Sequence, residues 1–188
     1  GLDVEKVLDA AATKWSFSRF SPGIGVGGHC IPVDPYYYVE ASAQIGSPTQ
    51  IVPIARKVND SMPTLSAKWV MDSINWKEDS RVLVLGYSYK PMLGDCRKTP
   101  VLNLSKKLHD FGLEVLAWDP YVDEDEYPEW VIEVTDPYNC DNLDAIILAT
   151  AHPECINLDW DRLLENCVDG VVFDGRRVLD PELMELSE

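Results

Sequence analysis

The stretch Arg81-Val82-Leu83-Val84-Leu85-Gly86 decides the fold that this sequence predicts. A short, almost wholly apolar run that ends on glycine is typical of a strand buried on both faces of a parallel sheet. Similar runs follow at 114–118, 144–150 and 170–174, with a weaker candidate at 131–134. Because helix-length segments separate these runs, we expect βαβ units and an α/β fold with a Rossmann-like, open, mainly parallel sheet.

The segment between the first two strands carries the signals of an amphipathic helix. Thr99 can cap this helix, Pro100 suits its first position, and Gly112 can end it. Its expected apolar stripe consists of Val101, Leu104, Leu108 and Phe111.

The first part of the chain is helical in character. Asp3 can cap a helix whose apolar residues share one face, and helical signals return at about 37–45 and 50–75. Pro63 must end or kink the last of these segments, so we expect either two helices or one bent helix there. We therefore assign residues 1–78 to a helical domain and residues 79–188 to the α/β domain.

Composition excludes several classes of function. The 188 residues are 46% hydrophobic, enough for a real core, and carry a net charge of −16. A nucleic acid or an anionic membrane surface requires an excess of Lys and Arg, so we expect neither partner. No run approaches the roughly 18 apolar residues of a membrane span, and no signal peptide is visible. Five cysteines without a Cys-x-x-Cys pair indicate free thiols in a reducing cytoplasm.

The loop at 21–35 is dense in glycine and proline. Residues 23–28 formally match the G-x-G-x-x-G pattern of dinucleotide-binding folds. The context argues against that function, because no strand precedes the match and Pro32 and Pro35 follow too soon for a helix. We interpret the glycines as a backbone loop that can approach a ligand closely and donate N–H groups to it. A simple turn between helices is the alternative.

Cys30 leaves this loop and enters a turn that begins with proline. Free N–H groups there would stabilise a thiolate. Asp34, four residues later, is close enough through one turn to share a site with Cys30. The alternative is an inert buried thiol, which is the commoner state of a cysteine. His152 and Cys155 lack a second pair of zinc ligands, so we expect no metal.

The stretch Ser21-Pro22-Gly23-Ile24-Gly25-Val26-Gly27-Gly28-His29-Cys30-Ile31-Pro32-Val33-Asp34-Pro35 closely resembles the active-site loop of the UDP-glucose/GDP-mannose dehydrogenase family. The resemblance continues, in the order of the family, at 59–63, 85–91, 95–100, 119–122 and 173–177. It implies that residues 1–78 belong to a central helical domain, through which the protein forms a homodimer, and that residues 79–188 form a UDP-binding domain.

Enzymes of this family oxidise C6 of a nucleotide sugar twice, from alcohol to carboxylate, with two NAD. The resemblance implies that Cys30 attacks the aldehyde, that the thiohemiacetal loses a hydride to give a thioester, and that water hydrolyses the thioester. Asp34 matches the residue that organises this water, and Arg97 a residue that reaches towards NAD. The positions that match substrate-binding residues are Ser21, Pro22, Gly23, Ile24, Gly25, Val26, Gly27, Tyr89, Lys90 and Arg176.

The three basic side chains also have ordinary interpretations. Lys90 would simply be solvated, Arg97 would pair with Asp95, and Arg176 would pair with Asp174 in a turn. A non-catalytic nucleotide-binding and dimerisation module is the alternative function of a different class.

His29 bears on the substrate. It takes the place of a serine that is common in the UDP-glucose and GDP-mannose enzymes, and it resembles relatives that act on UDP-N-acetylhexosamines. We therefore expect UDP-ManNAc or UDP-GlcNAc as the substrate, with UDP-glucose as the alternative. Lys14 and Arg19 both lie near the place of a family arginine that reaches the substrate of a neighbouring subunit.

The resemblance also assigns an NAD-binding domain and three further catalytic side chains to sequence outside these residues. We therefore expect the 188 residues alone not to turn over a UDP-sugar.

The net charge of −16 suggests a salt-rich cytoplasm and hence a halophilic source. At roughly molar ionic strength, repulsion between carboxylates is screened beyond about 3 Å. We predict that the free energy of unfolding, measured by urea denaturation, rises between low and molar KCl. An unfolding free energy that stays level or falls would remove the hypothesis.

Overall fold

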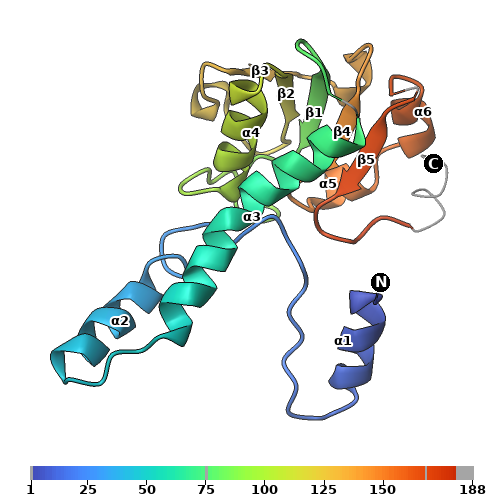
Figure 1. Ribbon diagram of the computed structural model, residues 1–188. Coiled ribbons are helices and arrows are strands. Elements are labelled where there is room, and N and C mark those ends of the chain that lie inside the picture. The colour runs from blue at the N-terminus through green and yellow to red at the C-terminus, as the bar shows by residue number, and fades with distance from the viewer. Residues whose placement is uncertain (1, 75, 168, 181–188) are drawn as a thin grey trace.

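The computed structural model describes residues 2–74, 76–167 and 169–180 and contains a five-stranded sheet (Figure 1). The strands lie in the order β3-β2-β1-β4-β5, and each neighbouring pair is parallel. The expected α/β fold with a Rossmann-like sheet is confirmed, and the weaker strand candidate is present as β3. The strands are β1 (Arg81–Leu85), β2 (Glu114–Trp118), β3 (Val131–Glu133), β4 (Ala145–Leu148) and β5 (Val171–Asp174).

β1 is the central strand, because it is third in the order of five and pairs with β2 on one edge and with β4 on the other. Leu85 is in register with Trp118 of β2 and with Leu148 of β4. Successive side chains of a strand point to opposite faces of the sheet, and the four from Val82 to Leu85 are all completely buried. Apolar cover on both faces is what the unbroken apolar run predicted.

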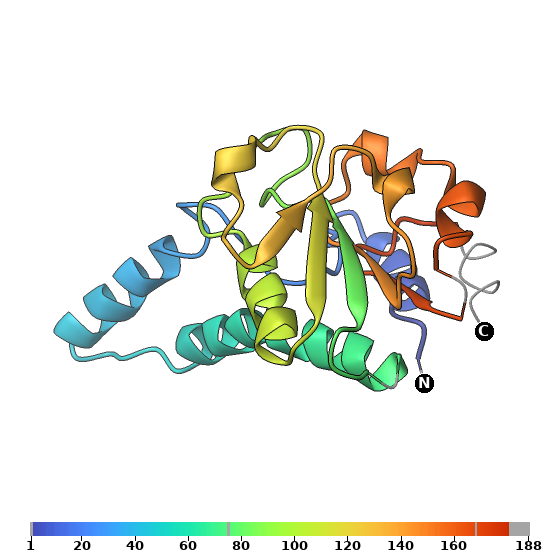
Figure 2. The ribbon, with the colours of Figure 1, turned by 90° about the horizontal axis from the view of Figure 1, so that it is seen from above.

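Helices cover the two faces of the sheet (Figure 2). The second half of α3 (Ile51–Ser73) and α4 (Pro100–Asp110) pack on the face that contains Val82 and Val84. The 3-10 turn η2 (Pro137–Asn139) and the short helices α5 (Pro153–Ile156) and α6 (Trp160–Leu164) belong to the opposite face. A further 3-10 turn, η1 (Glu124–Glu126), carries exposed acidic residues.

α4 has the predicted caps. Thr99 Oγ1 accepts a hydrogen bond from the N–H of Val101 at 3.2 Å, and Gly112 follows the helix with a φ of 85°. Phe111 departs from the predicted stripe. It follows the last helical residue and lies on the surface against Trp76, with ring centroids 6.0 Å apart.

The helical part consists of α1 (Val4–Ala12), α2 (Asp34–Gln44) and α3. Asp3 caps α1 as predicted, by accepting the N–H of Glu5 at 3.0 Å. α2 begins three residues before the predicted start at about 37, because Pro35 has a helical φ and is tolerated in the first turn. α2 and the first half of α3 lie side by side and extend away from the sheet (Figure 1).

α3 is one continuous helix that passes through Pro63. Of the two alternatives for this segment, the division into two helices is therefore wrong. Pro63 lacks an N–H, so the carbonyl of Asn59 loses its helical partner, yet the buried ring packs at the start of the half that covers the sheet. None of the described helices is both long and apolar enough to span a membrane.

Gly86 directly follows β1 with a φ of 80°, and it offers a test of how closely the segments after β1 and β4 must approach. A Cβ at this position would lie 2.5 Å from the carbonyl oxygen of Thr150 and 2.6 Å from its Cβ. We predict that Gly86→Ala lowers the free energy of unfolding by about 3 kcal/mol in urea denaturation. Gly46→Ala is the matched control, because Gly46 has a φ of 75° but no neighbouring atom within 4 Å, and its cost should be about 1 kcal/mol. Equal costs would contradict the packing argument.

Candidate functional site

Residues 21–28 form a loop that lies against the carboxyl edge of the sheet. β2 lies on one side of β1 and β4 on the other, so this edge contains a topological switch point, where open α/β sheets bind ligands. The loop contacts the segment after β1, the start of α4 and the turn after β5. We call it the glycine loop.

Two adjacent glycines of the glycine loop, Gly27 and Gly28, lie against the segment that follows β1. A Cβ on Gly27 would lie 2.6 Å from the Cβ of Tyr89 and 2.8 Å from the carbonyl oxygen of Lys98. A Cβ on Gly28, which has a φ of 88°, would lie 2.8 Å from the ring of Tyr89. Groups of the α/β domain thus fill the space that side chains would need, so the loop is more than a simple turn between helices.

Arg176 lies at the other end of the glycine loop. Its guanidinium group fills the space where a Cβ of Gly23 would be. Burial lowers the pKa of Arg176, an effect that nearby Asp174 partly offsets. The carboxylate of Asp174 accepts the backbone N–H groups of Arg176, Val178 and Leu179 at 2.7–2.9 Å. The pairing of Arg176 with Asp174 that we considered as the alternative is therefore made by the backbone N–H of Arg176. The guanidinium group of Arg176 faces the glycine loop instead.

The remaining predicted loop residues differ in exposure. Ser21 is exposed and Pro22 is half-buried. The side chain of Ile24 is only 1% exposed and belongs to the core, so Ile24 can offer a ligand only its backbone. Gly25 adopts a φ of 135° against Pro100.

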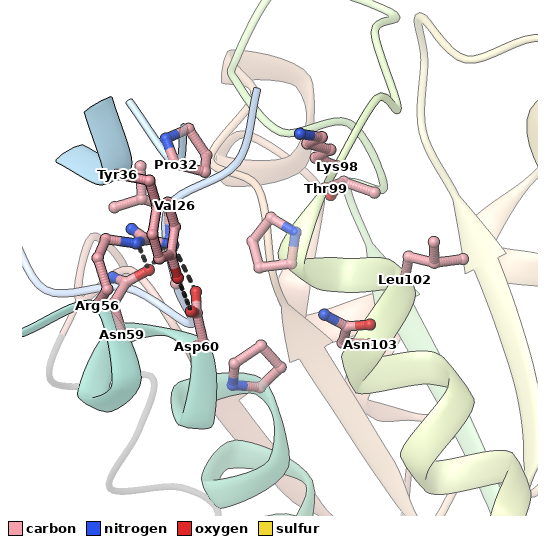
Figure 3. A pocket seen from close by; sticks show the side chains of 13 residues that line it. Val26, Pro32, Tyr36, Arg56, Asn59, Asp60, Lys98, Thr99, Leu102 and Asn103 are labelled. Carbon is pink, nitrogen blue, oxygen red and sulfur yellow. Dashed lines mark hydrogen bonds and ion pairs between the residues drawn. The ribbon is translucent and has the colours of Figure 1, made fainter. Parts of the chain in front are cut away.

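Side chains of α3 hold the middle of the glycine loop (Figure 3). Asn59 Oδ1 accepts the N–H of Val26 at 3.2 Å and a guanidinium N–H of Arg56 at 3.4 Å, while Arg56 also pairs with Asp60. The N–H of Val26 is thus occupied by the protein. A cleft of about 400 Å³ separates these residues from the start of α4.

The sequence-based predictions did not include Arg56, Asn59 and Asp60 among the site residues. Arg56, Asn59 and Asp60 recur at the i, i+3, i+4 spacing of one helix face, beside the proline that frees a carbonyl of the same turn. That spacing, together with the family resemblance at 59–63, was the available signal.

Cys30 is exposed, so the alternative of a buried thiol is wrong for this residue. Its carbonyl accepts the N–H groups of Val33 at 2.9 Å and of Asp34 at 2.8 Å. Asp34 is the first residue of α2 and lies one helical turn from Cys30, and it is also exposed. Solvent therefore reaches both groups. The other four cysteines all belong to the α/β domain and are half-buried or buried, and burial raises the pKa of Cys167 to about 11.

Two predicted basic residues follow β1. Lys90 is exposed and takes part in none of the ion pairs within the described ranges. Arg97 pairs with Asp95, as its ordinary interpretation expected, through N–O contacts of 2.6, 2.9 and 3.1 Å. Hydrogen bonds from Arg97 lower the pKa of Asp95 to about 2, and the proximity of His29 adds to this effect.

Comparison with known proteins identifies the family. The family model "UDP-glucose/GDP-mannose dehydrogenase family, UDP binding domain" matches residues 83–181, and the model for the central domain matches residues 1–61. The chain belongs to the UDP-glucose/GDP-mannose dehydrogenase family.

Relatives within the family are similar along nearly all of this chain. UDP-N-acetyl-D-glucosamine 6-dehydrogenase of Pseudomonas aeruginosa is 33% identical over 99% of this chain and 45% of the relative. UDP-N-acetyl-D-mannosamine dehydrogenase of Pyrococcus horikoshii is 31% identical over 95% of this chain and 41% of the relative. The structure of a UDP-glucose dehydrogenase from Pyrobaculum islandicum superposes with a TM-score of 0.83 at 28% identity, covering 95% of this chain and 41% of that one. The chain thus spans less than half the length of these members of the family.

The structure also separates the two residues near the place of the family arginine. Arg19 forms ion pairs with Glu5 and Asp9 of α1. Lys14 is exposed and enters none of the ion pairs between described residues. Arg19 therefore fastens the loop to α1, and Lys14 is left facing solvent.

The Asp95–Arg97 pair gives a pH-dependent prediction. Because the pKa of Asp95 is lowered from 3.8, the pair stabilises the fold fully above that value, and the contribution is lost as pH falls towards 2. We predict that Arg97→Ala raises the pKa of Asp95 towards 3.8, measured by NMR titration of the carboxyl carbon. Arg162→Ala, on the distant α6, should leave the pKa unchanged. An Asp95 that still titrates near 2 without Arg97 would contradict the assignment.

Proposed function

We propose that these residues form the cysteine-bearing and nucleotide-binding part of an NAD-dependent nucleotide-sugar 6-dehydrogenase. The observation that carries the proposal is the position of the glycine loop, which has exposed Cys30 after it and lies against the segments that bear Tyr89 and Arg176. The similar proteins named UDP-N-acetyl-D-glucosamine 6-dehydrogenase and UDP-N-acetyl-D-mannosamine dehydrogenase agree with it.

Local positive groups must recognise the anionic nucleotide against the net charge of −16. Lys90 and Arg176 suit this role, because no ion pair within the described residues neutralises either cation. They follow β1 and β5, on either side of β4 at the ligand-binding edge of the sheet. We assign the diphosphate to Lys90 and Arg176, and the sugar to the backbone of residues 21–27.

NAD, when bound, would accept the hydride in each oxidation. The residues present fit a contact at the edge of such a cofactor rather than a complete site for it. Arg97 is 67% exposed at its side chain and could turn towards a phosphate, whereas the glycine loop is packed against protein and its Val26 N–H is taken.

Cys30 would perform the second oxidation as a covalent catalyst. Its thiolate sulfur forms a bond to the aldehyde carbon, and the resulting thiohemiacetal gives up a hydride and a proton to become a thioester. Water then adds to the thioester carbon, the C–S bond breaks, and carboxylate and thiolate result. Asp34, one turn away, would orient this water and accept its proton.

We propose UDP-ManNAc or UDP-GlcNAc as the substrate, with UDP-glucose as the alternative. The presence of His29, which resembles relatives that act on UDP-N-acetylhexosamines, supports these two substrates. The names of the similar proteins support them as well. The similar structure of a UDP-glucose dehydrogenase favours the alternative.

We further propose that residues 1–78 are part of the central domain and that a homodimer forms through it. Ile51, Ile54 and Val58 expose an apolar strip on α3, which a second copy would cover. Lys14 would then be the residue that reaches the substrate of the neighbouring subunit. The two family models, which match residues 1–61 and 83–181, support a boundary near residue 78.

Binding of UDP tests the nucleotide site. We predict saturable binding of UDP to the protein in isothermal titration calorimetry. Lys90→Ala and Arg176→Ala should each weaken it about tenfold or more, because each removes a charge-assisted hydrogen bond. Arg162→Ala, whose guanidinium stacks on Tyr138 in the other layer, is the control and should bind as the parent does. Equal affinities in all three variants would contradict the assignment.

Alkylation of Cys30 tests the catalytic function against the non-catalytic module. We predict rapid, selective modification of Cys30 by iodoacetamide at neutral pH, slowed by UDP-GlcNAc or UDP-ManNAc and absent in Cys30→Ala. Mass spectrometry locates the adduct, and buried Cys140, Cys155 and Cys167 are the internal controls. A Cys30 that reacts no faster than free cysteine, with no protection by either sugar nucleotide, would favour the binding module.

A further inference from the structure

His152 is completely buried at the carboxyl edge of the sheet, shortly after β4. Its two ring nitrogens contact the segments that follow β1 and β2. Nε2 lies 2.9 Å from Asp119 Oδ2 and 3.0 Å from Ser88 Oγ, and Nδ1 lies 3.0 Å from the backbone nitrogen of Met92. A single side chain thus joins three adjacent loops of the ligand-binding edge.

The contacts fix the proton on this ring. The N–H of Met92 donates to Nδ1, so Nδ1 must be the unprotonated nitrogen and Nε2 carries the hydrogen. Nε2–H then donates towards Asp119. Because both nitrogens are engaged, His152 has no lone pair left for a metal ion.

Asp119 completes the network from the end of β2. Its Oδ2 also accepts the N–H groups of Tyr87 at 2.7 Å and Ser88 at 2.9 Å, and its Oδ1 accepts that of Tyr121 at 2.9 Å. Burial by itself raises the pKa of Asp119, but the hydrogen bonds from His152 and from these N–H groups outweigh it and lower the pKa. The charged carboxylate is therefore a buried anchor with its lone pairs satisfied.

Hydrogen bonds of this network hold both ends of segment 87–92. Asp119 holds the first two residues of this segment, and Thr150 Oγ1 donates to the carbonyl of Ser88 at 2.6 Å. His152 holds Met92, which adopts a φ of 60° that is uncommon for a residue with a side chain. Tyr89 and Lys90 lie between these two hydrogen-bonded ends of the segment.

We propose that His152 is a positioning residue for nucleotide binding, which holds segment 87–92 so that Tyr89 and Lys90 face the ligand. His152 cannot touch a ligand itself, because it is completely buried. This inference rests on the proposed function, which assigns the nucleotide to Lys90.

The variants His152→Asn and His152→Gln each keep one of the two hydrogen bonds of His152, to Met92 and to Asp119 respectively. The oxygen of Asn can lie near the position of Nδ1 and accept the N–H of Met92, but Asn is too short to reach Asp119. The amide of Gln can reach Asp119 but has no acceptor at the position of Nδ1. Leu163→Ala is the matched control, since Leu163 is equally buried in the core of the sheet but belongs to α6.

We expect His152→Ala to weaken UDP binding about tenfold in calorimetry and to speed exchange of the Met92 amide in NMR. His152→Asn should recover most of the affinity and of the amide protection, and His152→Gln should recover less. Leu163→Ala should lower the unfolding temperature and keep the UDP affinity within about twofold. All affinities are measured well below the unfolding temperature of each variant.

Two outcomes would overturn the inference. In one, Leu163→Ala loses as much UDP affinity as the His152 variants, which would make the effect one of stability alone. In the other, the Met92 amide exchanges at the parental rate in His152→Gln. If the parent protein binds no UDP, the proposed function fails, and the exchange rates still decide whether His152 holds the segment.

Discussion

The contact between the backbone of Gly27 and the side chain of Tyr89 joins the helical part of the chain to the sheet. A side chain at position 27 would have to pass within 2.6 Å of Tyr89 and 2.8 Å of the Lys98 carbonyl, so only glycine permits this approach. Cys30 follows three residues later and opens the turn into α2. The position of the thiol relative to the sheet therefore depends on a contact in which the absence of a Cβ is the essential chemical feature.

α3 provides the second connection between the two parts. Ala67, Val70 and Met71 in its second half are buried in the core of the sheet. Asn59 in its first half accepts the N–H of Val26. One rigid helix thus supports the glycine loop from one side while the α/β domain closes on it from the other, and the loop has little freedom to move independently of the sheet.

Local signals in the sequence were sufficient for the five strands and for α4 of the α/β part. The apolar run of β1, the Thr99 cap and the glycine at position 112 each act within a few residues, and the structure has the predicted elements. Tertiary contacts explain what the local signals missed. α3 continues through Pro63, and Ala67, Val70 and Met71 of the half that follows are buried in the core of the sheet. Asp119 and His152 are 33 residues apart in the chain, a separation that no periodicity reveals. The glycine pattern suggested a close approach of the backbone, but it did not reveal that Arg176 and Tyr89, both more than 60 residues along the chain, are the side chains approached.

We propose that the anionic part of a nucleotide lies between Lys90 and Arg176, at one end of a loop that leads to Cys30. The most direct test is a crystal structure of this protein with UDP bound. We predict diphosphate oxygens within hydrogen-bonding distance of Lys90 Nζ and the Arg176 guanidinium group, beside the backbone of residues 21–27. A diphosphate held instead in the cleft between Arg56 and Lys98, with no contact to Lys90 or Arg176, would contradict it.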